Sequence, residues 1–415
     1  MNISFFTNKY LIFLLAFFSP MVINIGGEVS PSFLFILVTF FFWKTNLNFK
    51  KDGILRSFSG LFYILIVLQT CLIPFGEADL FIQLKGLLIT VSGLLNFWFY
   101  YLVYSKNQGV VKWAVLGTFL SSFVFINELA LIDGTDYGFW KFNVMPRIVA
   151  LCCVIYLFTC NVKPLYKLAP YIFIGVGLLG IATGARSTGL QPLLAGGLVC
   201  FLSRTTKRIN LKVVKIYILV GAIVAYMAYA LVYVPAVLSG EINQGNSEQL
   251  KNVENPYNPI NLLMLGRGDS MVSFVAFFDK PLFGWGFGTS DPHEYYHYLQ
   301  LKLSSNEDLF NPERIEFKER IPQHSVIGSY ACSYGVIAFV VMCLFFIRVW
   351  KYSYYSLIIV DKYLLYRLIL LFSFTWNFLF SPPSHFKVSI PMNMAIIIVF
   401  AAKAITQSKD KKVSK

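Results

Sequence analysis

The chain has 415 residues, of which 57% are hydrophobic and only 13% are charged, and its mean hydropathy is positive. This composition excludes a soluble globular domain and places the chain in a lipid bilayer. The net charge of +14 does not indicate nucleic acid as a partner, because the basic residues gather in short polar breaks between apolar runs and there report membrane topology.

The apolar runs predict an all-α polytopic membrane protein. A spanning helix needs about 20 apolar residues, and the sequence contains about twelve runs of nearly that length, although runs such as 30–43 and 189–202 are short for a full span. The first run ends near Glu28 without a persuasive cleavage site, so we expect a retained helix and not a signal peptide. The expected helix centres are Leu15, Phe35, Ile66, Leu94, Phe123, Val154, Gly177, Leu194, Ala225, Phe339, Phe374 and Ile397.

Charge alternates along the breaks between these runs. Basic residues fill every second break, for example at Lys106 and Lys112, whereas an intervening break carries Glu77 and Asp79. The positive-inside rule then predicts that both termini are cytoplasmic. We expect one membrane domain over residues 1–415, with a large loop at 236–322, between the ninth and tenth helices, that faces the periplasm or the exterior.

Two segments of this outer loop have local patterns. Apolar residues recur at helical spacing over 269–278, which predicts an amphipathic helix on the membrane surface. The glycine-rich run 284–288 superficially resembles a phosphate-cradling loop. It lacks the flanking strand and helix of a dinucleotide fold, so we interpret it as a turn that packs aromatic residues at the membrane interface.

Three cationic residues are candidates for binding an anion. Arg186 is expected at the outward tip of a tight hairpin, where it either snorkels to lipid phosphate or binds a ligand. Arg267 either pairs locally with Asp269 or joins Arg186 in clamping a phosphate or diphosphate, a role that the guanidinium fork suits. Lys85, at the outer end of its helix, either snorkels or adds a third positive charge.

His324 lies where the outer loop re-enters the membrane. It is either a structural, hydrogen-bonded histidine or a general base, because imidazole groups commonly titrate near neutral pH. His293 and His297 have the spacing of a metal-binding pair on a helix, but no third ligand is indicated nearby. The cysteines, seven in number, all lie in apolar runs, so neither a disulfide framework nor a zinc site is indicated. No metal and no cofactor are expected.

Three ordered motifs over about residues 170–345 resemble the O-antigen polymerase and O-antigen ligase superfamily of membrane glycosyltransferases. The first is Thr-Gly-Ala-Arg-Ser around Arg186, and the second is Arg267 followed by Asp-Lys-Pro-Leu-Phe-Gly-Trp-Gly-Phe-Gly from Asp279. The third is His324-Ser325 followed by Tyr-Gly-Val-Ile from Tyr334. Each motif alone is weak, and their ordered combination carries the resemblance.

The resemblance implies a fold related to the C-type glycosyltransferases, a place in the bacterial inner (plasma) membrane and an undecaprenyl-diphosphate-linked glycan as donor. Arg186 and Arg267, with Lys85, would hold the diphosphate without a metal, and His324 would activate an acceptor hydroxyl. Implied partners are an acceptor glycan, membrane lipids and a chain-length regulator.

Two activities within this family remain open. A polymerase joins lipid-linked repeat units of O-antigen or capsule type, whereas a ligase transfers the glycan to lipid A core and so completes lipopolysaccharide. Many ligases have a second histidine two positions before the re-entrant one, where this chain has Pro322, which favours polymerase. The rival from another class is a lipid-linked oligosaccharide flippase or other transporter, for which paired repeats would be expected; none is found in the sequence.

Overall fold

The computed structural model describes residues 3–24, 28–125, 136–204, 223, 226–227, 229–240, 255–258, 261, 267–303, 320–357 and 361–413. Within these ranges the chain is almost entirely helical. The named strands are β1 (Ile23–Asn24) and β2 (Glu28–Val29), which pair antiparallel. The expectation of an all-α protein is therefore confirmed for the described part, apart from this small hairpin.

Five helices in the described part are long and apolar enough to cross a membrane. They are α5 (Gly53–Leu72) with the turn that follows it, α6 (Leu80–Lys106), α10 (Met145–Thr159) with a preceding π-helical turn, α11 (Lys163–Ala182) and α19 (Val326–Ser356). Each is close to or above the roughly 20 residues that a bilayer requires. The chain is an α-helical membrane protein.

Shorter helices occupy most of the other predicted positions. Eleven of the twelve expected centres lie inside helices. The remaining centre, Ala225, lies outside the described residues. Two of these helices, α2 (Lys9–Phe17) and α3 (Pro31–Val38), have only 9 and 8 residues and cannot span a bilayer alone. The others are α7 (Val111–Val124), α12 (Arg186–Arg204), α20 (Leu364–Phe380) and α21 (Ser389–Val413).

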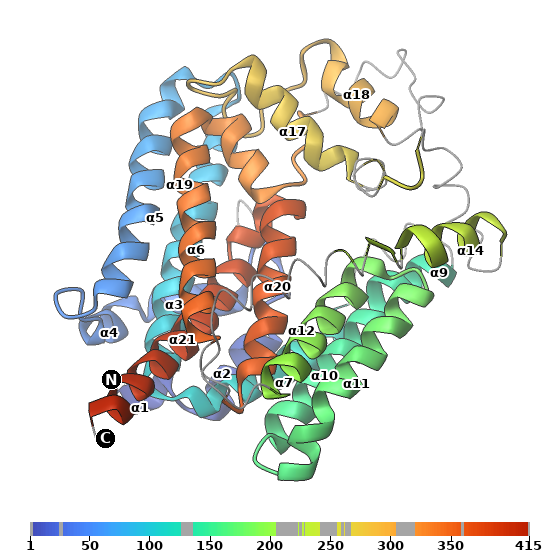
Figure 1. Ribbon diagram of the computed structural model, residues 1–415. Coiled ribbons are helices and arrows are strands. Elements are labelled where there is room, and N and C mark those ends of the chain that lie inside the picture. Colours follow the sequence, from blue (N-terminus) through green and yellow to red (C-terminus); the bar gives the residue numbers. More distant parts are fainter. Residues whose placement is uncertain are drawn as a thin grey trace.

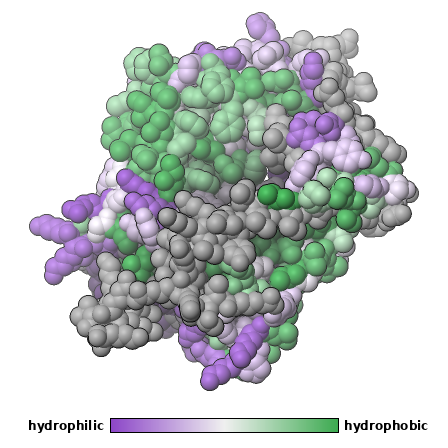
Figure 2. All heavy atoms as spheres, viewed as in Figure 1, coloured by the Kyte–Doolittle hydropathy of each residue, from purple (hydrophilic) through white to green (hydrophobic). Residues whose placement is uncertain are grey.

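The long helices form two groups that meet at α20 (Figure 1). The helices α5, α6, α19 and α21 pack together, and α10, α11 and α12 form a second, tilted group that contacts α20 through α12. The core of the first group is aromatic, because Phe62 packs against Phe97, Phe345 and Phe386. Hydrophobic side chains also cover the outer surface of this group (Figure 2), as lipid contact requires.

Two helices lie across one end of this bundle, α17 (Gly268–Asp279) and α18 (Tyr295–Leu303). The helix predicted over 269–278 is confirmed in position. However, its apolar face is buried against protein, since Val272 and Ala276 pack with Tyr296, Ile321 and Cys332 in a second small core. The interval 236–322 therefore contains packed helices that anchor on α19.

The connection between α20 and α21 does not reach the end of the bundle that carries α17 and α18. A Cβ atom added at Gly93, in the middle of α6, would lie 2.5 Å from the carbonyl oxygen of Phe386. Asn96 also donates a hydrogen bond to the carbonyl of Lys387, at 3.0 Å. These contacts place the connection, which we call the recessed connection (residues 381–388), about halfway along α6 and below α17 (Figure 1).

Candidate functional site

The glycine-rich segment after α17 docks on a break in α19. Gly335 has φ +73° and ψ −164°, which interrupts the helical backbone. The freed carbonyls of Cys332 and Ser333 accept hydrogen bonds from the N–H groups of Trp285 and Gly286, at 2.8 and 3.0 Å. A broken helix within a membrane protein needs such substitute partners. The predicted turn is present, and its main chain completes the hydrogen bonding of α19.

Glycine is required on both sides of this contact. Gly284 has φ +72°, and a Cβ atom there would lie 2.5 Å from the main chain of Cys332. A Cβ atom on Gly335 would lie 2.1 Å from the carbonyl oxygen of Leu282. Both residues combine a left-handed backbone conformation with close approach of another backbone, and glycine alone meets both conditions without strain.

The start of α17 brings Arg267 and His324 to the same place. Arg267 is the N-cap residue of α17. One turn later, the hydroxyl of Ser270 donates to the carbonyl oxygen of His324 at 2.9 Å, and Ser273 donates to that of Pro322 at 3.0 Å. The side chain of His324 is exposed, whereas that of Arg267 is partly buried. Two of the predicted site residues, 57 positions apart in sequence, therefore meet at one end of α17.

Aromatic side chains support the Arg267 guanidinium. Its central carbon lies 4.9 Å from the ring centre of Trp376 and 5.8 Å from that of Phe380, both in the last turns of α20. A guanidinium stacked on a ring face is held in orientation and keeps its N–H groups at its edges, where they can meet a planar or tetrahedral anion. The aromatic support was not predicted from the sequence.

Arg186 begins α12 directly after the turn that ends α11, so the predicted hairpin tip is confirmed. Gly184 in that turn has φ +82°. The Arg186 side chain is partly buried, and its guanidinium carbon lies 5.5 Å from the ring centre of Tyr233. The helix α12 that Arg186 begins packs against α20.

Lys85 does not join this group through any contact in the described part of the chain. Its side chain is exposed, and its ammonium group lies 4.8 Å from the ring centre of Phe81, one turn earlier in α6.

A local ion pair between Arg267 and Asp269 stays an open alternative, because the side chain of Asp269 is not among the described side chains.

His293 and His297 do not meet the condition for a metal-binding pair, which is that both lie on one helix. His293 lies before α18, in a short 3-10 turn, and has φ +56°. The two imidazoles are therefore not on successive turns of one helix. No group of three or more His, Cys, Asp or Glu side chains in the described ranges is placed to hold a metal ion.

A buried acidic residue holds α18 in place. The carboxylate of Asp291 accepts hydrogen bonds from the N–H groups of Tyr296 and His297, at 3.1 and 2.6 Å. Burial raises the pKa of Asp291 although these bonds act in the opposite direction. Burial, together with the hydrogen bond to Asp279, also raises the pKa of Tyr296. These groups position the outer helices that carry Arg267.

His385 is a histidine that the sequence reasoning missed. It lies in the recessed connection, with Nδ1 3.3 Å from the hydroxyl of Ser389, and burial lowers its pKa. The signal was a polar break, Ser-Pro-Pro-Ser-His from Ser381, between two apolar runs.

Comparisons of the chain with protein-family models, with curated proteins and with solved structures found no match.

Proposed function

We propose that this protein is a metal-independent membrane glycosyltransferase that polymerises lipid-linked polysaccharide repeat units. The donor would be a glycan on undecaprenyl diphosphate, and the acceptor a sugar hydroxyl of another lipid-linked unit. The single observation that best supports this proposal is the hydrogen bond between Ser270 and the main chain of His324. It couples a candidate base to the helix start that carries Arg267.

In the proposed reaction, a hydroxyl oxygen of the acceptor attacks the anomeric carbon of the donor. The C–O bond to the diphosphate breaks, and undecaprenyl diphosphate leaves with the bonding electron pair. His324 accepts the proton of the attacking hydroxyl. Arg267 and Arg186 would stabilise the charge that develops on the diphosphate, as preorganised donors do in other transfer reactions. Lys85 would contribute at most long-range attraction, because its recorded contact is with Phe81 of its own helix.

The surroundings of Arg267 support its role in binding the donor diphosphate. Its guanidinium is stacked on Trp376 and Phe380, which restrains its orientation. A C-type glycosyltransferase fold, about twelve spans, cytoplasmic termini and location in the bacterial inner membrane belong to the same proposal.

Two alternatives make different predictions in the host. A ligase would transfer the finished glycan to lipid A core, and a flippase would carry the lipid-linked unit across the membrane without chemistry. Arg267 and His324 lie at one end of the bundle, whereas transporter sites usually lie near its middle. This position supports an enzyme over a flippase. Pro322, where many ligases have histidine, supports polymerase over ligase.

Deletion of the gene in the native host separates these three functions. Loss of a polymerase should leave single repeat units on the cell surface and no long chains, because a separate ligase still attaches unpolymerised units. Loss of a ligase should instead leave polymerised glycan on undecaprenyl diphosphate. Loss of a flippase should trap repeat units at the cytoplasmic leaflet, and that result would refute the catalytic role of His324.

A further inference from the structure

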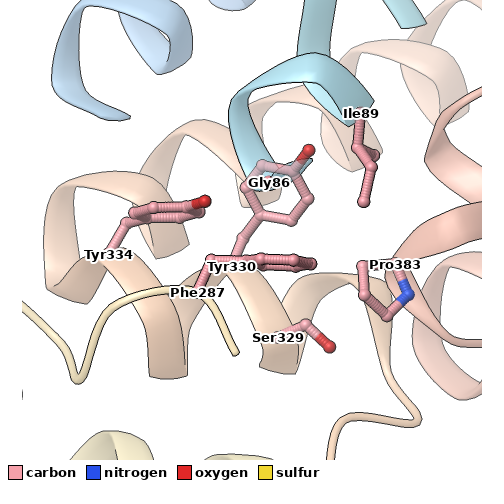
Figure 3. A pocket seen from close by; sticks show the side chains of 7 residues that line it. All are labelled: Gly86, Ile89, Phe287, Ser329, Tyr330, Tyr334 and Pro383. Atoms are coloured by element: carbon pink, nitrogen blue, oxygen red, sulfur yellow. The ribbon is translucent and has the colours of Figure 1, made fainter. Parts of the chain in front are cut away.

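The two ends of the helix bundle differ in the space that they enclose. Near α17, the rings of Phe287, Tyr330 and Tyr334 close in on Gly86, and the space between them is too small for a water molecule (Figure 3). At the opposite end, where α21 runs towards the C-terminus (Figure 1), a cavity of about 380 Å³ is open. This volume lies within the range of ligand pockets, about 300–1,000 Å³. We call it the lysine cavity, and its lining is Gln108, Gly109, Asp361, Lys362, Tyr363, Phe400 and Lys403.

The lysine cavity lies at the ends of apolar helices, at the depth of the lipid headgroups. Gln108 follows α6 by two residues, and residues 361–363 directly precede α20. The ends of helices of spanning length reach the interface between membrane and water. The positive-inside rule assigns this end of the bundle to the cytoplasm.

The second helix group fixes the wall that carries Lys362. Tyr156 of α10 donates a hydrogen bond to the carbonyl oxygen of Lys362, at 2.7 Å, and Tyr166 of α11 donates to that of Asp361, at 3.4 Å. Phe400, which also lines the cavity, belongs to α21 of the first group. The lysine cavity therefore lies on the seam between the two groups, and a ligand in it would contact both.

The lining keeps a positive charge. The carboxylate of Asp361 accepts a hydrogen bond from Arg367, at 3.0 Å, and this ion pair cancels the negative charge of Asp361. Lys362 donates to the neutral carboxamide of Asn161, at 2.8 Å. No acidic side chain in the described part of the chain pairs with Lys362 or Lys403. Both ammonium charges are therefore left for an anion.

Apolar surface adjoins these charges. A smaller cavity of about 50 Å³ shares Gln108, Gly109 and Tyr363 with the lysine cavity. It is also lined by Lys112, whose ammonium group lies 4.8 Å from the ring centre of Phe158. The Phe158 side chain, in α10, is 38% exposed. Ammonium groups beside an exposed apolar ring suit an amphiphile that has an anionic head and apolar chains.

From these observations we infer that the lysine cavity binds the phosphate of an anionic phospholipid headgroup from the cytoplasmic leaflet. Lys362 and Lys403 pair with the phosphate oxygens, and the acyl chains lie along the apolar surface that includes Phe158. Basic pockets between membrane helices recognise lipid headgroups in this way. The bound lipid braces the seam between the two helix groups. Arg267 and His324 lie at the opposite end of the bundle, so this site does not depend on the proposed function.

Paired lysine variants test the site. Lys362→Gln with Lys403→Gln removes both charges, whereas Lys362→Arg with Lys403→Arg keeps them. Lys50→Gln with Lys351→Gln is the matched control, because these lysines are expected at the same membrane face but lie outside the cavity lining. All four lysines are exposed, so the melting temperatures of the three variants without lipid should stay close to that of the wild type.

The probe is dioctanoyl phosphatidylglycerol, added to the purified full-length protein in a neutral detergent. A ligand that binds the folded state raises the melting temperature, so the rise at each lipid concentration gives the affinity. One lysine near an anionic lipid contributes about a fivefold gain in affinity, so the glutamine pair should bind about thirtyfold more weakly. The arginine pair and the control pair should bind as the wild type does. Added salt should weaken binding.

Equal binding by the wild type and the glutamine pair would overturn the inference, as would absence of binding to the wild type. Equal stabilisation by dioctanoyl phosphatidylcholine, whose headgroup has no net charge, would contradict the role of the lysines. Equal stabilisation by glycerol phosphate, which has no acyl chains, would replace the lipid with a soluble phosphate. If the glutamine pair is less stable without lipid, Lys403→Gln alone decides, with an expected loss of about fivefold, because that side chain is exposed on α21.

Discussion

Arg267 is the residue at which two parts of the candidate site meet. Its backbone begins α17, whose next turn binds the main chain at His324, and its side chain rests on the aromatic end of α20. Any movement of α17 would therefore shift the guanidinium and the imidazole together. For a reaction that depends on fixed geometry, such coupling is useful, because displacements of about 1 Å can cost a hundredfold in rate.

Alanine at Arg186, Arg267 or His324 is expected to reduce glycan transfer by about a hundredfold or more. One donor aimed at developing charge contributes about 3 kcal/mol, and a general base contributes roughly a hundredfold to ten-thousandfold in rate. Lysine at either arginine position should restore only part of the activity, since it lacks the guanidinium fork. Lys85→Ala should have the smallest effect. The measurement is transfer by purified protein at equal abundance, and full activity in one of the three alanine variants would remove that residue from the site.

His385 predicts a pH dependence of stability. Burial lowers the pKa of this imidazole in the folded protein, so the folded state favours the neutral ring. Between that lowered pKa and the usual value of about 6.5, the unfolded chain binds a proton that the folded chain does not, and stability must fall as the pH falls through this window.

The corresponding experiment is thermal unfolding between about pH 5 and pH 8. The wild-type melting temperature should decrease on acidification below about 6.5, and His385→Gln should remove part of that decrease. His293→Gln, at an exposed histidine, is the control and should leave the profile as in the wild type. Identical profiles for wild type and His385→Gln would show that protonation of His385 is not linked to folding.

At the level of elements, the break in α19 determines where the outer segment can dock. Gly335 frees two carbonyls, and the segment from Pro281 supplies the N–H groups that they require. The sequence contains these glycines, but it could not reveal that the two segments pack together. A contact between residues 285 and 332 leaves no pattern in local residue spacing. The helix over 269–278 was predictable, since its apolar residues recur every three to four positions. The small protein core against which this helix packs was not predictable from the sequence.

Gly335→Ala is expected to destabilise the protein by more than the roughly 1–3 kcal/mol of backbone strain alone, because its Cβ would also displace the carbonyl of Leu282, 2.1 Å away. Gly197→Ala is the matched control. That glycine lies within α12 and has nothing within 4 Å of an added Cβ, so alanine should be neutral or stabilise by up to about 1 kcal/mol. Equal melting temperatures for the two variants would contradict the docking role of Gly335.

For the whole molecule, composition and apolar runs were sufficient to predict a helical membrane protein. Five helices in the described part have spanning length, whereas the runs around Leu15 and Phe35 form helices of 9 and 8 residues. Hydropathy measures how apolar a run is, but it does not reveal where a helix breaks. The meeting of Arg267 and His324 was expected only from the family resemblance, and the aromatic support from α20 was not expected at all.

Membrane topology can be tested with two matched serines. Ser239 follows α14 (Val234–Leu238), and a cysteine there should face outward. Ser105 lies at the far end of α6, and a cysteine there should face the cytoplasm by the positive-inside rule. Both positions are exposed. In a background with the exposed Cys71 replaced by serine, an impermeant thiol reagent should label only Ser239→Cys in intact cells. The reverse pattern would move the proposed site to the cytoplasmic face.

The most direct test of the proposed function uses purified protein and lipid-linked repeat units extracted from the native host. We predict a ladder of longer glycans that remain attached to undecaprenyl diphosphate, and no ladder with His324→Ala, which should melt at the same temperature because His324 is exposed. Absence of elongation by folded wild-type protein, or equal ladders from wild type and His324→Ala, would contradict the assignment of this chain as a polymerase that uses His324 as its base.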